Sequence, residues 1–216
     1  MRKRMLHLWI RAEQRKNEKR VGITPQDASK LICKGIKVTV EESADRIISN
    51  EEYHKVGCKI ANEHSWPRAP KDAIILGLKE LSEDIERLEH KHVMFGHAFK
   101  GQTAGLKLLK KFKVGKGLLY DLEYLTDPEG RRLAAFGYWA GYSGAAVSLK
   151  AYADQQNTKG ICGPVSVFES KETMADDIRN AFVNVENKFP KILVVGALGR
   201  VGKGCLLYTS PSPRDS

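Results

Sequence analysis

The 216-residue sequence contains no long hydrophobic run and no cysteine framework. Its apolar stretches fall far short of the roughly 18–20 residues of a membrane-spanning helix, and the N-terminal segment MRKRMLHLWI becomes polar too early for a signal peptide. The four cysteines show neither metal-ligand spacing nor a disulfide pattern. We therefore expect a cytoplasmic protein in a reducing compartment, with no membrane partner and no bound metal.

The sequence also lacks a nucleic-acid recognition motif, although its formal net charge is +10. Basic residues cluster at 2–4, 15–20 and 107–116, but aromatic residues are not interleaved with them. Solvated helix faces and a site for an anionic substrate explain this charge more simply than nucleic acid does. We expect small-molecule substrates and no nucleic-acid partner.

Apolar runs bounded by turn residues alternate with segments of helical periodicity. Thr24 and Pro25, for example, form a helix start, with threonine as the N-cap and proline at the first helical position. This alternation is typical of an α/β fold with parallel sheets. The expected strands are 5–10, 36–41, 73–78, 93–96, 117–120 and 192–195; the expected helices are 25–34, 50–56 (capped by Asn50), 102–112, 139–152 and 173–189; 82–90 is expected to be helical or coiled, and 127–130 to be a turn.

A glycine-rich segment, KILVVGALGRVGKG at 191–204, is typical of a strand that turns into a nucleotide-binding helix. Gly196, Gly199 and Gly202 allow a tight turn and close backbone approach, and the helix N-terminus favours a pyrophosphate. A nucleotide domain needs about a hundred further residues, with an acidic ribose-binding residue roughly 20 positions on. Only 12 residues follow Gly204. We expect the chain to begin this domain without completing it.

The last segment, CLLYTSPSPRDS at 205–216, is expected not to continue the helix, because Ser-Pro-Ser-Pro is a breaker cluster. Its first six residues match the translation of a common sequencing adapter. We therefore expect the tail to be foreign to the natural protein, the alternative being a natural disordered C-terminus. A natural C-terminus beyond this chain leaves a peroxisomal location open.

Ionisable residues gather at the expected strand ends, where the loops of α/β domains build their sites. A partly desolvated lysine leaving a buried strand can act as a base, and a histidine can carry protons near neutral pH. The three segments are Lys79-Glu80, Phe95–Lys100 around His97, and Tyr120–Leu125 with Glu123, followed by Arg131 and Arg132.

Each segment also has a purely structural interpretation. A lysine–glutamate pair after a strand is most often a solvated loop, a lone histidine in an apolar strand is most often a core residue, and paired arginines after a turn are most often at the surface. A glycine motif without its acidic partner is a weak signal. The residues alone indicate a nucleotide-dependent α/β enzyme with an anionic substrate, and they leave the reaction open.

A series of longer motifs narrows the choice of function. The motifs are LHLWIRAE at 6–13, Glu18-Lys19-Arg20 with Thr24-Pro25, GLKE at 77–80, HVMFGHAFKGQ at 92–102, LYDLEYL at 119–125, GRRLAAFGYWAG at 130–141 and GALGRVGKG at 196–204. Together they resemble saccharopine dehydrogenase, the NAD-dependent, L-lysine-forming family, over residues 5 to 204. LYDLEYL and GRRLAAFGYWAG set the chain apart from alanine dehydrogenase, which belongs to the same superfamily.

The resemblance implies oxidation of saccharopine with NAD, followed by hydrolysis to lysine and 2-oxoglutarate, the last step of lysine synthesis through aminoadipate. It implies that Lys79 takes the amine proton and that His97 shuttles protons during hydrolysis. Glu80 and Glu123 match carboxylates expected to tune the pKa values of these groups. Arg20, Gln102, Arg131, Arg132 and Phe136 match substrate-binding positions, and Gly196, Gly199, Arg200 and Gly202 match the cofactor loop.

The implied architecture is two Rossmann-like domains: residues 1–136 form a substrate domain without its C-terminal return segment, and 137–204 begin the NAD-binding domain. The whole protein is expected to be a monomer, and residues 1–216 alone are expected to be inactive. Two alternatives stay open. One is the lysine-ketoglutarate reductase half of a bifunctional lysine-degrading enzyme. The other is a non-catalytic anion-binding module, against which the residues of a proton relay count.

Overall fold

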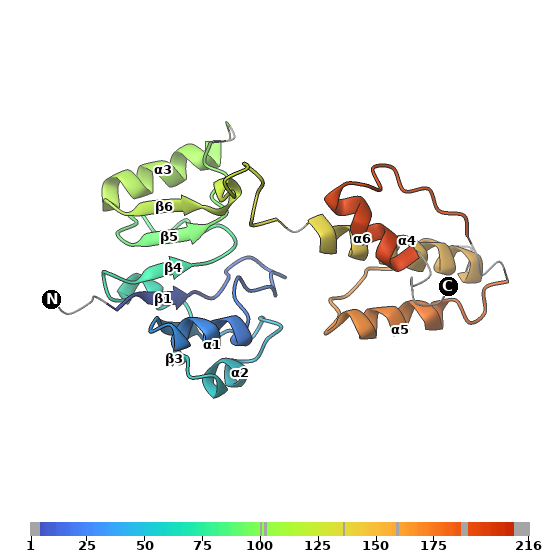
Figure 1. Ribbon diagram of the computed structural model, residues 1–216, viewed down its shortest axis with the longest axis horizontal. Helices are drawn as coiled ribbons and strands as arrows, with labels where there is room; N and C mark the ends of the chain where they lie inside the picture. The colour runs from blue at the N-terminus through green and yellow to red at the C-terminus, as the bar shows by residue number, and fades with distance from the viewer. Residues whose placement is uncertain are drawn as a thin grey trace. The chain divides into compact units, whose positions relative to one another are not determined.

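The computed structural model describes residues 5–99, 101, 103–135, 137–158, 160–186 and 190–209. The chain divides into two compact units, Met1–Ala134 and Ala135–Ser216, which we call the first unit and the second unit (Figure 1). That the second unit begins a cofactor domain stays a prediction.

The first unit is built on a parallel sheet of six strands in the order β3-β2-β1-β4-β5-β6. The strand order reverses between β1 and β4, which is the switch point of a doubly wound sheet. The expected α/β fold with parallel strands is therefore confirmed for this unit. The strands are β1 (His7–Ile10), β2 (Lys37–Glu41), β3 (Lys59–Ala61), β4 (Ile74–Leu76), β5 (Lys91–Met94) and β6 (Leu118–Asp121).

Capping residues fix where the helices of this unit begin. Thr24 accepts the N–H of Asp27 ahead of Pro25, as expected. The second helix has Ser49 as its N-cap in a capping box with Glu52, so the expectation that Asn50 is the cap is wrong. The helices are α1 (Pro25–Cys33), α2 (Asn50–Lys55) and α3 (Thr103–Gly115), with short 3₁₀ turns at Trp66–Arg68 and Leu122–Tyr124.

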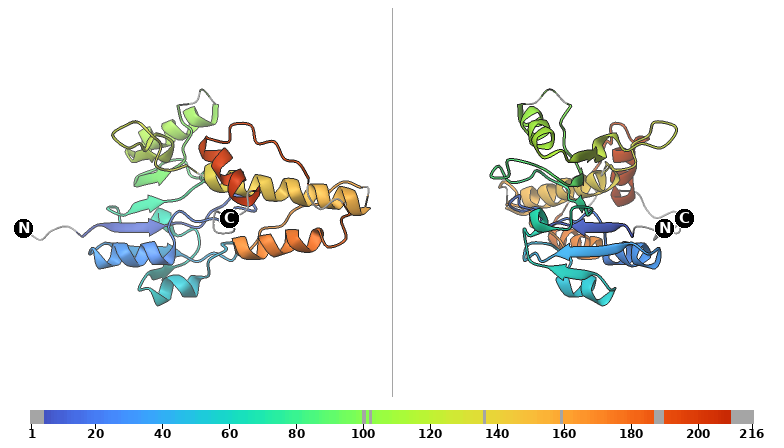
Figure 2. Two further views of the ribbon diagram at one scale, coloured as in Figure 1. Left: turned by 45° about the vertical axis from the view of Figure 1, so that its right-hand side comes forward. Right: turned by 90° about the vertical axis from the view of Figure 1, so that its left-hand side faces the viewer.

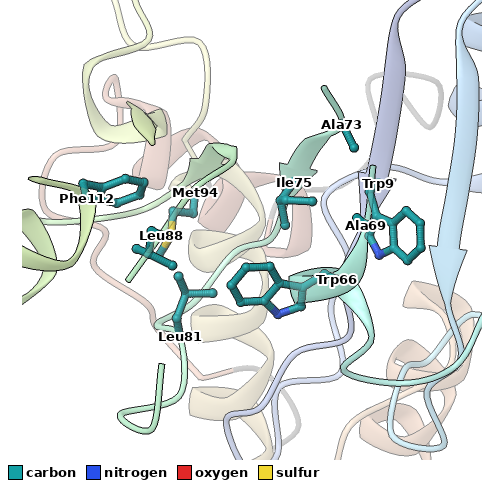
Figure 3. Packing of buried hydrophobic residues seen from close by; sticks show 9 residues of the cluster. All are labelled: Trp9, Trp66, Ala69, Ala73, Ile75, Leu81, Leu88, Met94 and Phe112. Atoms are coloured by element: carbon teal, nitrogen blue, oxygen red, sulfur yellow. The ribbon is translucent and has the colours of Figure 1, made fainter. Parts of the chain in front are cut away.

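Side chains that alternate along the strands form two hydrophobic clusters on opposite faces of the sheet. Ile10 and Leu76 belong to the cluster under α1 and α2. Figures 1 and 2 show these two helices at the β3 end of the sheet and α3 at the β6 end. The other cluster, drawn in Figure 3, contains Trp9, Trp66, Ala69, Ala73, Ile75, Leu81, Leu88, Met94 and Phe112.

The second unit consists of helices α4 (Gly137–Thr158), α5 (Lys171–Ala181) and α6 (Arg200–Thr209), and its described residues form no strand. Glycines let α4 and α6 approach closely: a Cβ on Gly141 would lie 1.9 Å from the Val201 carbonyl oxygen, and one on Gly204 would lie 1.9 Å from the Tyr138 carbonyl oxygen. Tyr142, Ala146, Met174 and Ile178 form its buried cluster.

Two expectations about the second unit are wrong. Residues 192–195 are not a strand, and Leu193 and Val195 are 88% and 89% exposed. A parallel strand needs neighbouring strands for its backbone hydrogen bonds, and the described part of this unit supplies none. The helix also continues through Cys205 to Thr209, because Pro211, the first helix-breaking residue, comes only afterwards.

Two further differences are smaller. The helix expected at 173–189 is the shorter Lys171–Ala181, which Ser170 caps. The edge strand β3 was not expected. Residues 82–90 are coiled, which is one of the two states expected for them. The turn at 127–130 is confirmed, since the Gly130 N–H donates to the Asp127 carbonyl oxygen. Among the described residues, no helix is both long and apolar enough to cross a membrane.

Candidate active site

The carboxyl ends of parallel strands lie at one edge of their sheet, and most of the expected site residues follow such ends. Lys79 follows β4, His97 follows β5 and Glu123 follows β6. Since β4, β5 and β6 are consecutive neighbours, these residues share one edge of the first unit. They form two groups: the Lys79 cluster (Arg11, Glu13, Glu18, Arg20 and Lys79) and the His97 cluster (His97, Asp121, Glu123 and Arg132).

A buried carboxylate joins two of the three basic side chains of the Lys79 cluster, Arg20 and Lys79. Glu18 accepts hydrogen bonds from Arg20 Nε at 2.8 Å and from its terminal nitrogen at 2.6 Å. The same carboxylate lies 3.9 Å from Lys79 Nζ. The hydrogen bonds from Arg20 lower the pKa of Glu18 and raise the pKa of Arg20. Glu18 is thus an anion near neutral pH, beside an amine whose side chain is only 29% exposed.

The backbone at Lys79 is held from the end of β1. Glu13 accepts the N–H of Leu78 at 2.6 Å and the N–H of Lys79 at 3.0 Å, one on each carboxylate oxygen. Arg11 donates to the Lys79 carbonyl oxygen and lies 3.3 Å from Glu13. Burial lowers the pKa of Arg11, but an arginine remains charged at any physiological pH. Sequence reasoning missed both residues as functional candidates.

A narrow cleft opens beside the Lys79 cluster at the switch point between β1 and β4. Its lining includes Gly77 and the four charged residues of the Lys79 cluster other than Lys79 itself: Arg11, Glu13, Glu18 and Arg20. Doubly wound sheets bind their ligands at this position. The cleft thus brings the guanidinium of Arg20 to the place where a doubly wound sheet binds its ligand.

The His97 cluster is more open. His97 has a left-handed backbone with φ of 48°, its side chain is 47% exposed, and its ring stacks on Phe95 at 6.2 Å. Its Nδ1 lies 3.8 Å from Glu123, whose carboxylate accepts a 2.9 Å hydrogen bond from Arg132. Asp121 accepts the N–H of Gly96 and the N–H of Glu123, which holds the two loops together.

The core-histidine interpretation applies to His92 and not to His97. His92 lies on β5, fully buried, with its ring 4.9 Å from that of Trp66 and 5.4 Å from that of Phe112. Its Nε2 has no hydrogen-bond partner. Burial, with the nearby charges of His90 and Arg11, lowers the pKa of His92 to about 3. This imidazole stays neutral inside the core.

Two expected site residues have their charges engaged elsewhere. Glu80 is exposed, and its carboxylate lies 3.3 Å from Arg15 Nε. The guanidinium of Arg131 is held on its own turn by Asp127 at 2.9 Å and Glu129 at 3.1 Å. Either residue has to change partners before it can contact a substrate. Gln102 and Phe136 lie outside the described residues.

The glycine loop of the second unit has the expected tight turn. Gly196 has φ of 78°, and its carbonyl oxygen accepts the Gly199 N–H at 2.9 Å. A Cβ on Gly202 would lie 2.2 Å from that same oxygen, so only glycine fits. Arg200 begins α6 directly after the turn. The glycine loop and helix start thus fit a dinucleotide, whereas the preceding strand is not formed.

The end of β2 is closed to a nucleotide, although the first unit has Rossmann strand order. A Rossmann sheet that binds a dinucleotide places an acidic residue about here to accept the ribose hydroxyl. Glu41 is fully buried, and its two oxygens accept hydrogen bonds from the Trp9 indole and the backbone amides of Ala12, His64 and Trp66. With these four donors it has no capacity left for a ribose. No cluster of metal-binding side chains occurs among the described residues.

Comparison with known proteins places the chain in a family. Residues 9–143 match the family model "Alanine dehydrogenase/PNT, N-terminal domain". The chain resembles an L-alanine dehydrogenase structure with a TM-score of 0.61 over 94% of this chain and 52% of that one, at 16% identity. At this identity the likeness shows the fold alone.

The curated relatives are closer in sequence. The chain is 42% identical to "Saccharopine dehydrogenase [NAD(+), L-lysine-forming]" of Schizosaccharomyces pombe, and 43% identical to the protein of that name from Emericella nidulans. Each similarity covers 92% of this chain and 55% of the relative, so the chain spans about half the length of these relatives. The resemblance expected from the motifs is confirmed, and the chain belongs to the family defined by the alanine dehydrogenase/PNT N-terminal domain.

Proposed function

We propose that the natural protein containing this chain is an NAD-dependent saccharopine dehydrogenase that forms L-lysine. One observation carries the proposal. A chain more than 40% identical to enzymes of that name has Lys79 and His97, each with a carboxylate partner, after adjacent strands of one sheet. Two side chains that are chemically able to transfer protons at the edge where doubly wound sheets bind ligands support the proposal.

The overall reaction converts saccharopine, NAD⁺ and water into L-lysine, 2-oxoglutarate, NADH and a proton. NAD, when bound, supplies the acceptor for the hydride that leaves the substrate carbon. Gly196, Gly199, Arg200 and Gly202 are the residues of this chain that would hold it, because their turn and helix start fit a pyrophosphate.

The two ionisable groups divide the proton transfers between them. Lys79, as a neutral amine, takes the proton from the secondary amine of saccharopine as that nitrogen becomes an imine. His97 then moves protons as water adds to the imine carbon and the amine of lysine leaves. Glu123, 3.8 Å from His97 Nδ1, orients the ring for these transfers. Glu80 remains a candidate for tuning Lys79.

Arginines suit the substrate because saccharopine carries three carboxylates, and a guanidinium can hold one of them with two parallel hydrogen bonds. Arg20 and Arg132 already stand beside Lys79 and His97 through Glu18 and Glu123. We assign substrate binding to these two, together with Arg131, Gln102 and Phe136.

The lysine-ketoglutarate reductase half of a bifunctional enzyme is the second candidate. Longer proteins also match this chain: "Alpha-aminoadipic semialdehyde synthase" of Arabidopsis thaliana is 29% identical over 153 residues, which is 68% of this chain and 14% of that protein. The lower identity and shorter match favour the first candidate.

An assay of the purified natural gene product tests the proposal. We expect NAD-dependent oxidation of saccharopine with equal yields of lysine, 2-oxoglutarate and NADH. We also propose that the protein is a cytoplasmic monomer, which sedimentation and fractionation check. A protein that only condenses lysine with 2-oxoglutarate, and shows no NAD-dependent oxidation of saccharopine, would support the second candidate. A protein inactive in both directions would support neither.

A further inference from the structure

We infer that Arg11 and Glu13 are positioning residues that fix the backbone of Lys79 for proton transfer. The inference rests on the proposed function, in which Lys79 is the base. Neither residue needs to touch the substrate to act in this way. Their role would be to set where the Lys79 side chain starts, and therefore where its Nζ can reach.

Glu13 holds the N-terminal side of Lys79. Its side chain is 8% exposed and comes from the loop after β1, whereas Lys79 belongs to the loop after β4. One carboxylate oxygen accepts the Leu78 N–H at 2.6 Å, and the other accepts the Lys79 N–H at 3.0 Å. Two hydrogen bonds to a charged acceptor fix two consecutive peptide units across the switch point.

Arg11 holds the C-terminal side of the same residue. Its guanidinium donates to the Lys79 carbonyl oxygen and to the Ala12 carbonyl oxygen, and it lies beside Glu13. It crosses directly over Gly77, where a Cβ would lie 2.2 Å from Arg11 Nε. The glycine of the GLKE motif therefore leaves the space that the guanidinium occupies.

The side chain of Lys79 has no comparable restraint. Its ion pair with Glu18 is 3.9 Å long, beyond hydrogen-bond distance. The backbone contacts thus determine the placement of Nζ more than the side-chain contact does. A displacement of about 1 Å at a reacting group can lower a rate by roughly 100-fold.

Two variants of the natural protein test the inference. Glu13→Gln places an amide NH₂ against one backbone N–H, so one of the two hydrogen bonds is lost. Arg11→Lys keeps the charge beside Glu13 but cannot donate in a fork to two carbonyl oxygens. We expect each to lower kcat for saccharopine oxidation by roughly 10- to 100-fold, with KM for saccharopine and NAD changed by less than about threefold.

Glu52→Gln is the control, because Glu52 is also a carboxylate that accepts a backbone N–H, that of Ser49 in the capping box of α2, but belongs to no contact of the Lys79 cluster. We expect it to lower the Tm while kcat per folded molecule stays near wild type. If either test variant fails to fold, the other still decides, because the two remove different contacts.

A double-mutant cycle supplies the decisive readout. If Glu13 acts through Lys79, then Glu13→Gln should lower kcat in the wild-type background and have less than about a threefold effect in a Lys79→Met background. Multiplicative losses, or a wild-type kcat in both Glu13→Gln and Arg11→Lys, would overturn the inference while the proposed function stands. A wild-type protein that does not oxidise saccharopine would reject the proposed function instead.

Discussion

The Lys79 cluster and the His97 cluster lie at the same sheet edge but differ in how they are held. Around Lys79, the charged partners Arg11, Glu13 and Glu18 are buried, and several fixed hydrogen bonds join two loops. His97 is half exposed. The Lys79 side chain is 29% exposed and that of His97 is 47% exposed, so Lys79 is the more shielded of the two.

This difference matches the two kinds of chemistry in the proposed reaction. Removing a proton from the amine needs a base that is shielded and fixed in direction, since water would compete for the same hydrogen bonds. Hydrolysis of the imine needs a group that water can reach. Lys79 and His97 meet these opposite requirements through their surroundings.

The largest effect is expected for substitution of Lys79, the more shielded of the two residues. In the natural protein, Lys79→Met should lower the turnover of saccharopine oxidation by roughly 10³- to 10⁴-fold, because methionine cannot accept the proton and the side chain at this position is only 29% exposed. NAD affinity should be unchanged, since Lys79 is not part of the glycine loop. The control is Lys71→Met, an exposed lysine whose ion-pair partner is Glu89 at 3.8 Å. Steady-state kinetics with both variants check this; a turnover within tenfold of wild type for Lys79→Met would contradict it.

Substitution of His97, in the more exposed cluster, should lower turnover less than substitution of Lys79. His97→Asn suits the left-handed backbone at this position, which asparagine tolerates well. We expect turnover to fall by roughly 100-fold, at the lower end for a general acid–base group, because water can carry part of the proton traffic at a half-exposed site. The Tm should stay near wild type. A fully active His97→Asn enzyme would remove His97 from the proton relay.

The sequence could predict where Lys79 and His97 lie, because each follows an apolar strand whose end was readable; their roles are implied by the resemblance and stay predictions. It could not indicate Glu13 or Asp121 as supports. Their role is to accept backbone N–H groups from a neighbouring loop, and which loops are neighbours depends on the strand order. The spacing of residues along the chain does not reveal that β1 and β4 are neighbours in the sheet.

The same distinction between local signals and distant partners applies to the fold. The start of α1 was predictable because Thr24 and Pro25 act locally. The strand expected at 192–195 was not formed, because a strand depends on partners that an apolar pattern does not reveal. The three-residue β3 is an edge strand, too short for its pattern to stand out.

The next largest effect is expected on substrate binding. Arg132→Ala should raise KM for saccharopine by about 10- to 150-fold, the factor that corresponds to a lost hydrogen bond between charged groups. The control is Arg87→Ala, another exposed arginine, which lies 3.1 Å from Glu89. An unchanged KM in Arg132→Ala would show that the guanidinium does not bind the substrate.

The buried histidine gives a stability test that leaves the catalytic groups untouched. The pKa of His92 is about 3 in the folded protein and about 6.5 in an unfolded chain, so the unfolded state binds the proton first as the pH falls. Stability is therefore full above pH 6.5 and decreases between that pH and about 3. Between pH 7 and 5 this group should remove roughly 2 kcal/mol from the free energy of unfolding. Urea unfolding at both pH values measures it, and His92→Phe should reduce the dependence by that amount; an unchanged dependence would contradict the burial of a neutral imidazole.

The smallest effect is expected for Glu80, and it is best measured against that of Glu18, the other carboxylate near Lys79. Glu18 is buried and lies 3.9 Å from Lys79 Nζ, whereas Glu80 is exposed and pairs with the exposed Arg15. An exposed ion pair contributes about 0–1 kcal/mol, so Glu80→Gln should change kcat and KM by less than about fivefold. Glu18→Gln should have the larger effect, because it leaves Arg20 without its hydrogen-bonded anion. Kinetics at low and high salt compare the two, since salt screens only the exposed carboxylate. If Glu80→Gln proves the more damaging, Glu80 must change partners when substrate binds and join the Lys79 cluster in the working enzyme.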